Sequence, residues 1–271
     1  MTDKNTAPSI LVGCAGWSLP KAEDTDAFPA LGSHLERYAA VFPAVEINSS
    51  FYRPHRPATY ARWADSVPEH FRFAVKVPRA ITHDARMEGV EQQLVQFAHE
   101  AGELGDKLGC LLVQLPPKFG FVDETARAFF RQLHGIFGAG IVFEARHPSW
   151  FSEAATELLT ESRVARVIAD PAAGQSGPHV PTSSETVYLR LHGSPRIYYS
   201  RYAPQYVESV RRALTVQSEA GRTCWCIFDN TAAGEAVPNA LELLHGVGDG
   251  VLDEAAIAAA ARTSVLPAAP W

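Results

Sequence analysis

The chain has 271 residues, of which 46% are hydrophobic and 20% are charged, a composition typical of a globular protein with a sizeable core. The length suits one large domain, and α/β barrels often use it as a single domain. The formal net charge of −6 argues against a protein that binds nucleic acid mainly through electrostatic attraction.

The N-terminal segment MTDKNTAPS (residues 1–9) is polar and lacks the apolar stretch of a signal peptide, so we expect a flexible tail and a cytoplasmic protein. No run approaches the roughly 20 apolar residues of a membrane-spanning helix, so no membrane association is expected. The four cysteines lie in apolar, strand-like runs without C-x-x-C spacing, which predicts reduced core residues. The sequence carries no signal for an oligomeric state.

Eight short apolar runs have the length and composition of buried strands. They cover residues 9–17, 44–52, 71–78, 109–117, 140–146, 164–171, 186–193 and 223–230. Helical patterns follow most of these runs, at residues 32–40, 57–66, 88–105, 123–133, 152–162, 204–218 and 234–245. Ser33 and Asp123 are expected to cap two of these helices, and a Gly/Pro/Ser-rich loop is expected at residues 172–184.

This alternation of nearly continuous apolar strands with helices indicates parallel strand pairing under a helical cover. Eight such units in this length favour an α/β fold with a single (β/α)8 TIM-type barrel of parallel strands, over residues 10–250. The alternative is a doubly wound open sheet with an accessory region. Residues 251–271 are Ala-rich and are expected to form a C-terminal extension that packs on the barrel.

The polar residues of the predicted strands share one face of each strand, because side chains alternate along a strand. Helices must cover the outside of a barrel with apolar contacts, so we expect the polar face to point inward. Barrel enzymes place their chemistry at the C-terminal mouth, where most of these residues fall. The inward set is Glu46, Asn48, Lys76, Gln114, Glu144, Arg146, Asp170, Tyr188, Arg190 and His192.

Three carboxylates and three cations of this set would therefore meet near the mouth. A buried unpaired charge costs several kcal/mol, so these groups are expected to pair with each other or with a ligand. Arg190 lies further from its strand end than the others and is expected to be a structural partner of a carboxylate. The alternative is an ionic network that only fills the barrel.

Several longer motifs follow one another along the chain: GCAGW, EINSSFYRP, FAVKVPR, LLVQLPPKF, FEARHPSW, YLRLHG and the region from FDN to NALEL. With these motifs, roughly from Gly13 to Leu244, the chain resembles the domain-of-unknown-function-72 (YecE-like) family of barrel proteins. The resemblance implies a TIM-type barrel but no established activity, so it assigns no catalytic roles. One departure is Asp229 before Asn230, where the family more often has a second amide.

The favoured hypothesis is an acid–base enzyme of hydrolase, lyase or isomerase type, without a cofactor, that acts on a small substrate bearing a phosphate or carboxylate. Lys76 and Arg146 would bind the anion, Glu46 or Glu144 would be the general base, and His192 or His147 the acid. The catalytic candidates are Glu46, Glu144, Asp170 and His192. The substrate-binding candidates are Asn48, Tyr52, Lys76, Gln114, Arg146, His147, Trp150, Arg190 and Asn230. Tyr52 and Trp150 either line the pocket or only anchor their loops.

Two alternatives remain open from the sequence. A divalent metal held by Glu46, Glu144, Asp170 and His192 would support a metal-dependent hydrolase or isomerase, although the neighbouring cations disfavour it. Basic loops around Phe51 and Tyr52 are compatible with a non-catalytic module that binds a nucleotide or nucleic acid. No phosphate-binding loop, dinucleotide-binding motif or nucleophile elbow is present, and Ser49-Ser50 has no evident base beside it.

Overall fold

The computed structural model describes residues 10–20 and 26–248 of the chain. The strands are β1 (Ile10–Cys14), β2 (Ala44–Ile47), β3 (Arg72–Lys76), β4 (Leu108–Gln114), β5 (Gly140–Glu144), β6 (Val164–Arg166), β7 (Ile168–Asp170), β8 (Thr186–Leu191) and β9 (Thr223–Phe228). The α-helices are α1 (His34–Ala39), α2 (Ser49–Tyr52), α3 (Pro57–Asp65), α4 (Glu91–Ala101), α5 (Asp123–Ile136), α6 (Glu153–Glu161), α7 (Pro204–Glu219) and α8 (Ala236–Gly248). The expected N-terminal tail (residues 1–9) and C-terminal extension (residues 251–271) lie outside the described residues.

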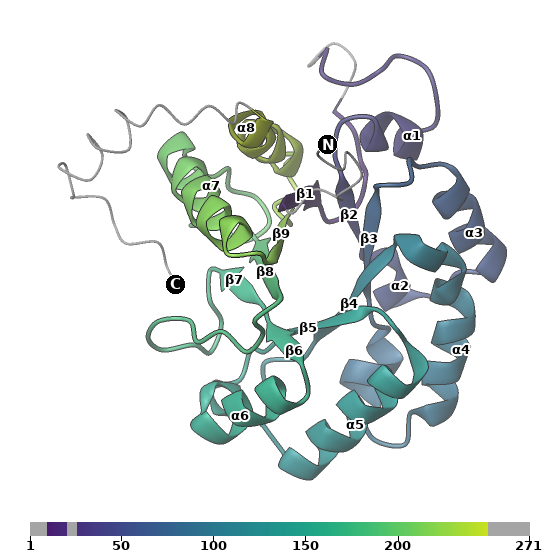
Figure 1. Cartoon of the computed structure of the whole chain (residues 1–271), viewed down its shortest axis with the longest axis vertical. Coiled ribbons are helices and arrows are strands. Elements are labelled where there is room, and N and C mark those ends of the chain that lie inside the picture. The colour runs from purple at the N-terminus through teal and green to yellow at the C-terminus, as the bar shows by residue number, and fades with distance from the viewer. Residues whose placement is uncertain (1–9, 21–25, 249–271) are drawn as a thin grey trace, which may run out of the picture.

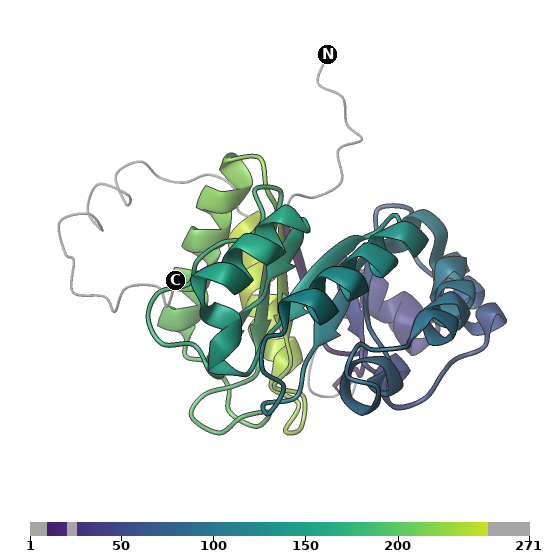
Figure 2. The same cartoon turned by 90° about the horizontal axis from the view of Figure 1, so that it is seen from below.

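The strands form two parallel sheets, one in the order β1-β9-β8-β7 and one in the order β2-β3-β4-β5-β6. Only Val167 separates β6 from β7, and its N–H donates to the carbonyl of Phe143 in β5, so the two short strands continue one another. At the other junction, a parallel bridge joins Ala15 to Glu46. Figure 1 shows the strands as a ring with the helices outside it, and Figure 2 shows the same cover from below. The fold confirms the predicted TIM-type (β/α)8 barrel.

The hydroxyl of Tyr38 on α1 strengthens the junction between β1 and β2. It accepts a hydrogen bond from the N–H of Cys14 at 2.8 Å and donates one to the carbonyl oxygen of Ala44 at 3.0 Å. Tyr38 is fully buried, so both bonds are shielded from water. A side chain of the helix layer therefore bridges two strands where the ladder between them is short.

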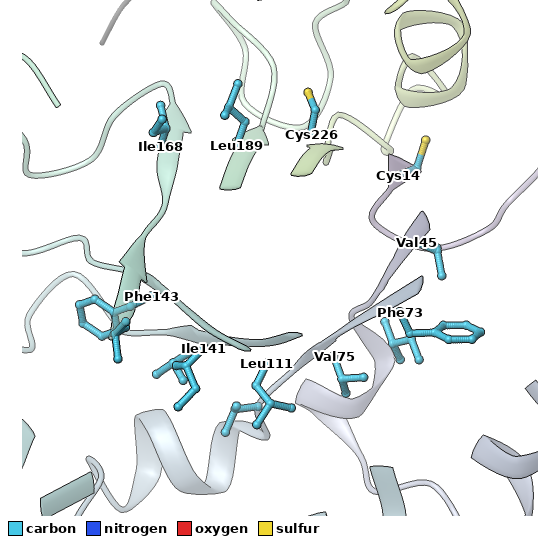
Figure 3. Close-up of a cluster of buried hydrophobic side chains, with 14 of the residues drawn as sticks. Cys14, Val45, Phe73, Val75, Leu111, Ile141, Phe143, Ile168, Leu189 and Cys226 are labelled. Atoms are coloured by element: carbon cyan, nitrogen blue, oxygen red, sulfur yellow. The ribbon is translucent and has the colours of Figure 1, made fainter. Parts of the chain in front are cut away.

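Outside β6 and β7, the side chains of the strands follow the predicted alternation. Val45, Phe73, Leu111 and Phe143 point out of the ring toward the helices in Figure 3, within the large hydrophobic core between the two layers. A second, smaller cluster lies inside the barrel. Its buried members are Leu11, Ala44, Ala74, Cys110, Leu112, Val142, Ala165, Val167, Tyr188, Trp225 and Ile227. The four cysteines are free and buried, as expected.

The helix starts agree with the sequence in one case and differ in another. Ser33 forms a capping box with Glu36, since each side chain accepts a hydrogen bond from the backbone N–H of the other residue. The prediction that Asp123 caps α5 is wrong, because Val122 occupies the cap position and Asp123 is already in the first turn. There its charge still favours the helix N-terminus, and it pairs with Arg127 at 2.8 Å.

The connection between β7 and β8 contains no helix and runs as the predicted loop, between α6 and α7 (Figure 1). The other links between successive strands of the ring each carry at least one helix. Among the described residues, no helix is long and apolar enough to cross a membrane.

Candidate functional site

The interior of the barrel near its C-terminal mouth contains an ionic cluster of Glu46, Glu144, Asp229, Arg190 and His192, all buried. Arg190 lies at its centre. Its Nε and Nη2 donate to the two oxygens of Glu46 at 3.0 and 2.7 Å, its Nη1 donates to Glu144 at 2.5 Å, and its Nη2 also donates to Asp229 at 3.0 Å. One guanidinium therefore holds three carboxylates that come from β2, β5 and the end of β9.

Further polar side chains satisfy the carboxylates of the ionic cluster. The Tyr188 hydroxyl donates to Glu46 at 2.8 Å. Gln114 and Arg146 donate to the same oxygen of Glu144, at 2.8 and 2.9 Å. A change at one carboxylate would therefore leave buried donors without partners.

The charges within the cluster favour its ionised form. Burial alone would raise the pKa of Glu144 and of Asp229, but Arg190 and His192 hold both pKa values below the usual range. Burial would lower the pKa of Arg190, but Glu46, Glu144 and Asp229 outweigh it and raise that pKa well above its ordinary value. Glu144 and Asp229 are therefore carboxylates at neutral pH.

His192 is the member of the cluster with a free donor position. Its Nδ1 lies 2.9 Å from Asp229, and its Nε2 lies 3.5 Å from Glu144. Within the described part of the chain, Nε2 has no hydrogen-bond partner. Burial lowers the pKa of His192, but Glu144 and Asp229 outweigh it and raise the pKa above 6.5. Protonation is therefore easier than for a free imidazole, and Nε2 is the ring nitrogen that a ligand could contact.

Lys76 ends β3 at the mouth, and its residue is only 7% exposed. Its Nζ lies 4.2 Å above the centre of the Phe51 ring, and among residues 10–20 and 26–248 it has no hydrogen bond or ion pair. Burial and the nearby Arg190 lower the pKa of Lys76 to about 8, although Glu46, Glu144 and Asp229 oppose this shift. Lys76 is therefore a nearly buried cation whose donors are not used by the protein.

The rim of the mouth adds aromatic and basic groups. Tyr198, in the loop after β8, places its ring edge-on to His192 with 5.8 Å between centroids, and its hydroxyl interacts with Arg146. The backbone of Tyr198 is in the left-handed region, with φ of 70°, a conformation that residues other than glycine rarely adopt. His83 packs against Phe51, and burial together with Lys76 lowers the pKa of His83 to about 4, so this imidazole is neutral.

Asp170 does not join the ionic cluster. Its carboxylate accepts a hydrogen bond from the Tyr206 hydroxyl on α7, outside the barrel. The prediction that it points inward is wrong because β6 and β7 place Ala165 and Val167 inside. Arg166 is also on the outer face, where a helix and a loop supply the polar partners that we expected only inside the barrel.

Three other candidates serve the loops rather than the cluster. Trp150 is fully buried, and its indole N–H donates to the carbonyl of Phe119 at 2.9 Å. His147 accepts the N–H of Ser149 and so begins the 3-10 helix η4 (Pro148–Phe151). The Asn230 side chain donates to Ser200 and Asn239, which fixes the loops after β8 and β9.

Of the two remaining candidates, Tyr52 is exposed and Asn48 has a buried, unpartnered oxygen among the described residues. Tyr52 is 78% exposed, its ring contacts that of Phe51 edge-on, and it makes no hydrogen bond, ion pair or ring contact with the ionic cluster in the part of the chain that the structure describes. Asn48 follows β2, and its side-chain oxygen is buried without a hydrogen-bond partner in the described residues. Asn48 therefore offers an acceptor that a ligand could satisfy.

The sequence analysis missed Asp229 as a site residue. Asp229 follows β9 on the same face as Trp225 and Ile227, which line the barrel interior. The same alternation that identified Glu144 and His192 would therefore have included it. Tyr198 gave no such signal, because a loop of irregular backbone brings it over His192.

Ser49 also differs from expectation. The Nε2 of His55 lies 2.8 Å from the Ser49 hydroxyl, so a potential base does lie beside this serine. Burial and the nearby Arg53 lower the pKa of His55, which keeps the imidazole neutral. The turn between α2 and α3 brings the two residues together, a contact that their spacing did not reveal.

The residues proposed as metal ligands are only partly assembled. Glu46, Glu144 and His192 surround Arg190, while Asp170 lies outside the barrel. Among the residues that the structure describes, no three His, Cys, Asp or Glu side chains are arranged to hold a metal ion. The metal-dependent alternative stays a prediction.

Fold and site together define a TIM-type barrel protein with a buried ionic cluster under its C-terminal mouth. The chain belongs to the family described as "Protein of unknown function DUF72", whose model matches residues 11–261.

Two relatives match this chain over different lengths. UPF0759 protein YecE of Escherichia coli (strain K12) is 32% identical over 168 residues, which is 59% of each chain, so the match spans less than two thirds of that relative. UPF0759 protein YunF of Bacillus subtilis (strain 168) is 24% identical over 273 residues, covering 87% of this chain and 94% of YunF.

Solved structures support the fold. A DUF72 family protein from Thermotoga maritima MSB8 matches with a TM-score of 0.73 and 23% identity, over 88% of this chain and 99% of that one. One from Enterococcus faecalis V583 also has a TM-score of 0.73, with 24% identity over 88% and 95% of the two chains. A sugar phosphate isomerase/epimerase from Parabacteroides distasonis matches with a TM-score of 0.55 and 14% identity, over 93% and 97%.

Proposed function

We propose that this protein is an enzyme of hydrolase, lyase or isomerase type that performs acid–base chemistry on a small anionic substrate at the mouth of the barrel. The observation that carries the proposal is Lys76, which is nearly buried and whose ammonium group makes no ion pair or hydrogen bond in the described part of the chain. Such a charge is costly to bury, and a bound phosphate or carboxylate would offset that cost.

Arg146 supplies the second anion-binding group. Its side chain is 23% exposed at the mouth, and it is bonded to Glu144 through Nε and Nη2, each at 2.9 Å. Glu144 therefore fixes the direction of the guanidinium while part of its planar donor set remains available. A guanidinium and an ammonium together suit a phosphate or carboxylate group.

His192 is the proposed general acid. It is held by Asp229, its pKa is raised by the two carboxylates beside it, and its Nε2 lies 3.5 Å from Glu144 without a hydrogen bond among the described residues. An acid with a pKa near the working pH can both donate and recover a proton. Arg190 keeps the pKa of Glu144 well below its usual range, so Glu144 is a poor proton acceptor. We assign it instead to orienting His192 and raising the pKa of His192.

The fold of the sugar phosphate isomerase/epimerase from Parabacteroides distasonis is compatible with this proposal. At 14% identity the likeness is one of architecture, and barrel folds carry many reactions. The likeness therefore guides only the choice of compounds to test, which should include sugar phosphates and small hydroxy and keto acids.

The first experiment compares the wild-type chain with Lys76→Met and Lys118→Met in a thermal-shift screen of such compounds. Lys118 is an exposed lysine after β4 and serves as the matched control. We expect a compound that raises the melting temperature of wild type and Lys118→Met but not of Lys76→Met. If every stabilising compound acts equally on Lys76→Met, the proposed anion site is wrong.

The second experiment tests the acid. A compound that passes the screen is incubated with wild type and His192→Gln, and its conversion is followed by NMR. We expect His192→Gln to keep binding but to lose conversion by about 100-fold or more, the usual contribution of a general acid. Equal conversion by both proteins would remove His192 from the mechanism.

A further inference from the structure

A second buried arginine lies away from the mouth and differs from Arg190 in its partners. Arg166 ends β6 on the outer face of the barrel and is only 4% exposed. Its Nη2 donates to the carbonyl of Trp150 at 3.0 Å and to the Thr156 hydroxyl at 2.9 Å, and its Nη1 donates to the carbonyl of Val180 at 3.3 Å. All these acceptors are neutral.

No carboxylate offsets this charge. Within the described residues, Arg166 makes no ion pair, and its buried Nε has no hydrogen-bond partner. Burial lowers the pKa of Arg166 to about 10, so the guanidinium is still charged at neutral pH. A buried guanidinium with only neutral acceptors keeps most of the electrostatic cost of leaving water.

Arg166 lines a cavity of about 190 Å³ on the outer flank of the barrel. Its lining residues come from β6, β7, the β7–β8 loop, the start of β8, α7 and the turn before β9, so the cavity lies where the chain between β7 and β8 forms a loop instead of a helix. Its wall also contains His179, Gln217 and Arg222, and none of its ten lining residues is acidic. The volume is enough for a small ion with a few waters.

The cavity wall also holds a second guanidinium and a neutral imidazole. Gln217 accepts a hydrogen bond from Nη1 of Arg222 at 2.5 Å, which holds this second guanidinium at the cavity wall. The Nδ1 of His179 is buried without a partner in the described part of the chain. Burial and Arg166 lower the pKa of His179 to about 4, so the imidazole is neutral beside the two arginines.

We propose that this cavity, between the β7–β8 loop and α7, binds a small oxyanion such as inorganic phosphate or sulfate through Arg166 and Arg222. The anion supplies the negative charge that the protein itself does not place beside Arg166. The site is separate from the ionic cluster, because Arg166 is on the outer face of the strand whose inner face carries Ala165 and Val167. It holds the β7–β8 loop against α7, in place of the absent helix.

The test uses Lys76→Met as the parent protein, so that phosphate bound at the mouth does not contribute. Isothermal titration with inorganic phosphate, at constant ionic strength in chloride, is carried out on this parent and on three further variants in the same background. These are Arg166→Met, Arg222→Gln and Arg131→Gln, the last an exposed arginine of α5. We expect one phosphate per chain in the parent and in Arg131→Gln, and affinity at least about tenfold weaker in the other two.

A second measurement does not depend on removing Arg166, whose loss could prevent folding. The imidazole signal of His179 is assigned with His179→Gln, and phosphate is added to the Lys76→Met protein in an NMR titration. We expect the His179 signal to move with the same affinity as the calorimetric binding. An unchanged His179 signal, no phosphate binding to the parent, or equal binding by the parent and Arg222→Gln would each overturn the proposal.

Discussion

Arg190 contacts both carboxylate oxygens of Glu46, with its Nε 3.0 Å from one and its Nη2 2.7 Å from the other. The two residues belong to different sheets, since Glu46 is in β2 and Arg190 is in β8. This ion pair therefore ties the two sheets together inside the barrel. The same guanidinium also contacts Glu144 and Asp229, so the cluster has a structural as well as a chemical role.

Replacing Arg190 with Met should lower the free energy of unfolding by about 3–5 kcal/mol, because three buried carboxylates would lose their shared cation. Urea unfolding measures this change. The control is Arg127→Met, since Arg127 pairs with Asp123 and Glu161 on the exposed surface of α5. We expect a much smaller loss there, because water screens exposed ion pairs. Equal losses of unfolding free energy in both variants would show that the buried ionic cluster stabilises the protein no more than an exposed ion pair.

His192 should make the stability depend on pH. Its folded-state pKa is raised, so its contribution is fully present below the unfolded value of about 6.5 and is lost as the pH rises through the folded value. Wild type should therefore exceed His192→Gln by more at about pH 6 than at about pH 9. Urea unfolding at the two pH values gives this difference.

The matched control for that experiment is Asp229→Asn, which removes one of the two carboxylates that raise the pKa of His192. In this background, the pH-dependent part of the effect of His192→Gln should shrink. A difference between wild type and His192→Gln that grows with rising pH would contradict the assigned electrostatics.

Gly13 in β1 tests the junction between β1 and β2. A Cβ at this position would lie 2.1 Å from the carbonyl oxygen of Ala44, and backbone in a packed strand cannot move away easily. Gly13→Ala should therefore cost about 3 kcal/mol or more. Gly135→Ala on α5 is the control, since nothing lies within 4 Å and the change should stabilise by up to about 1 kcal/mol. Circular dichroism melts compare the two variants, and a tolerated Gly13→Ala would mean that β1 and β2 are less closely joined.

The fold was accessible from the sequence because short apolar strand patterns alternate with helical patterns along the chain. The same alternation placed Glu46, Glu144, Arg190 and His192 on one side of their strands, and the structure brings them together. The alternation predicted these positions correctly because the helical layer contacts almost only apolar side chains of these strands.

The exceptions arise where a strand faces a loop or a polar helix residue. Asp170 and Arg166 lie on the outer face, and the Tyr206 hydroxyl and the carbonyl of Trp150 satisfy them there. No pattern within a single strand reveals partners that come from elsewhere in the chain. Contacts such as Tyr198 with His192 depend on loop geometry, which sequence alternation does not report.

The most direct test of the mouth as an anion site is the titration of Lys76 itself. NMR of the protein labelled with ¹³C at the lysine ε carbons, with Lys76→Met for assignment, gives its pKa. We expect a value of about 8 in the free protein, set mainly by burial, and a higher value when an anion from the screen is bound. A pKa near the ordinary 10.5 that no anion changes would contradict the account.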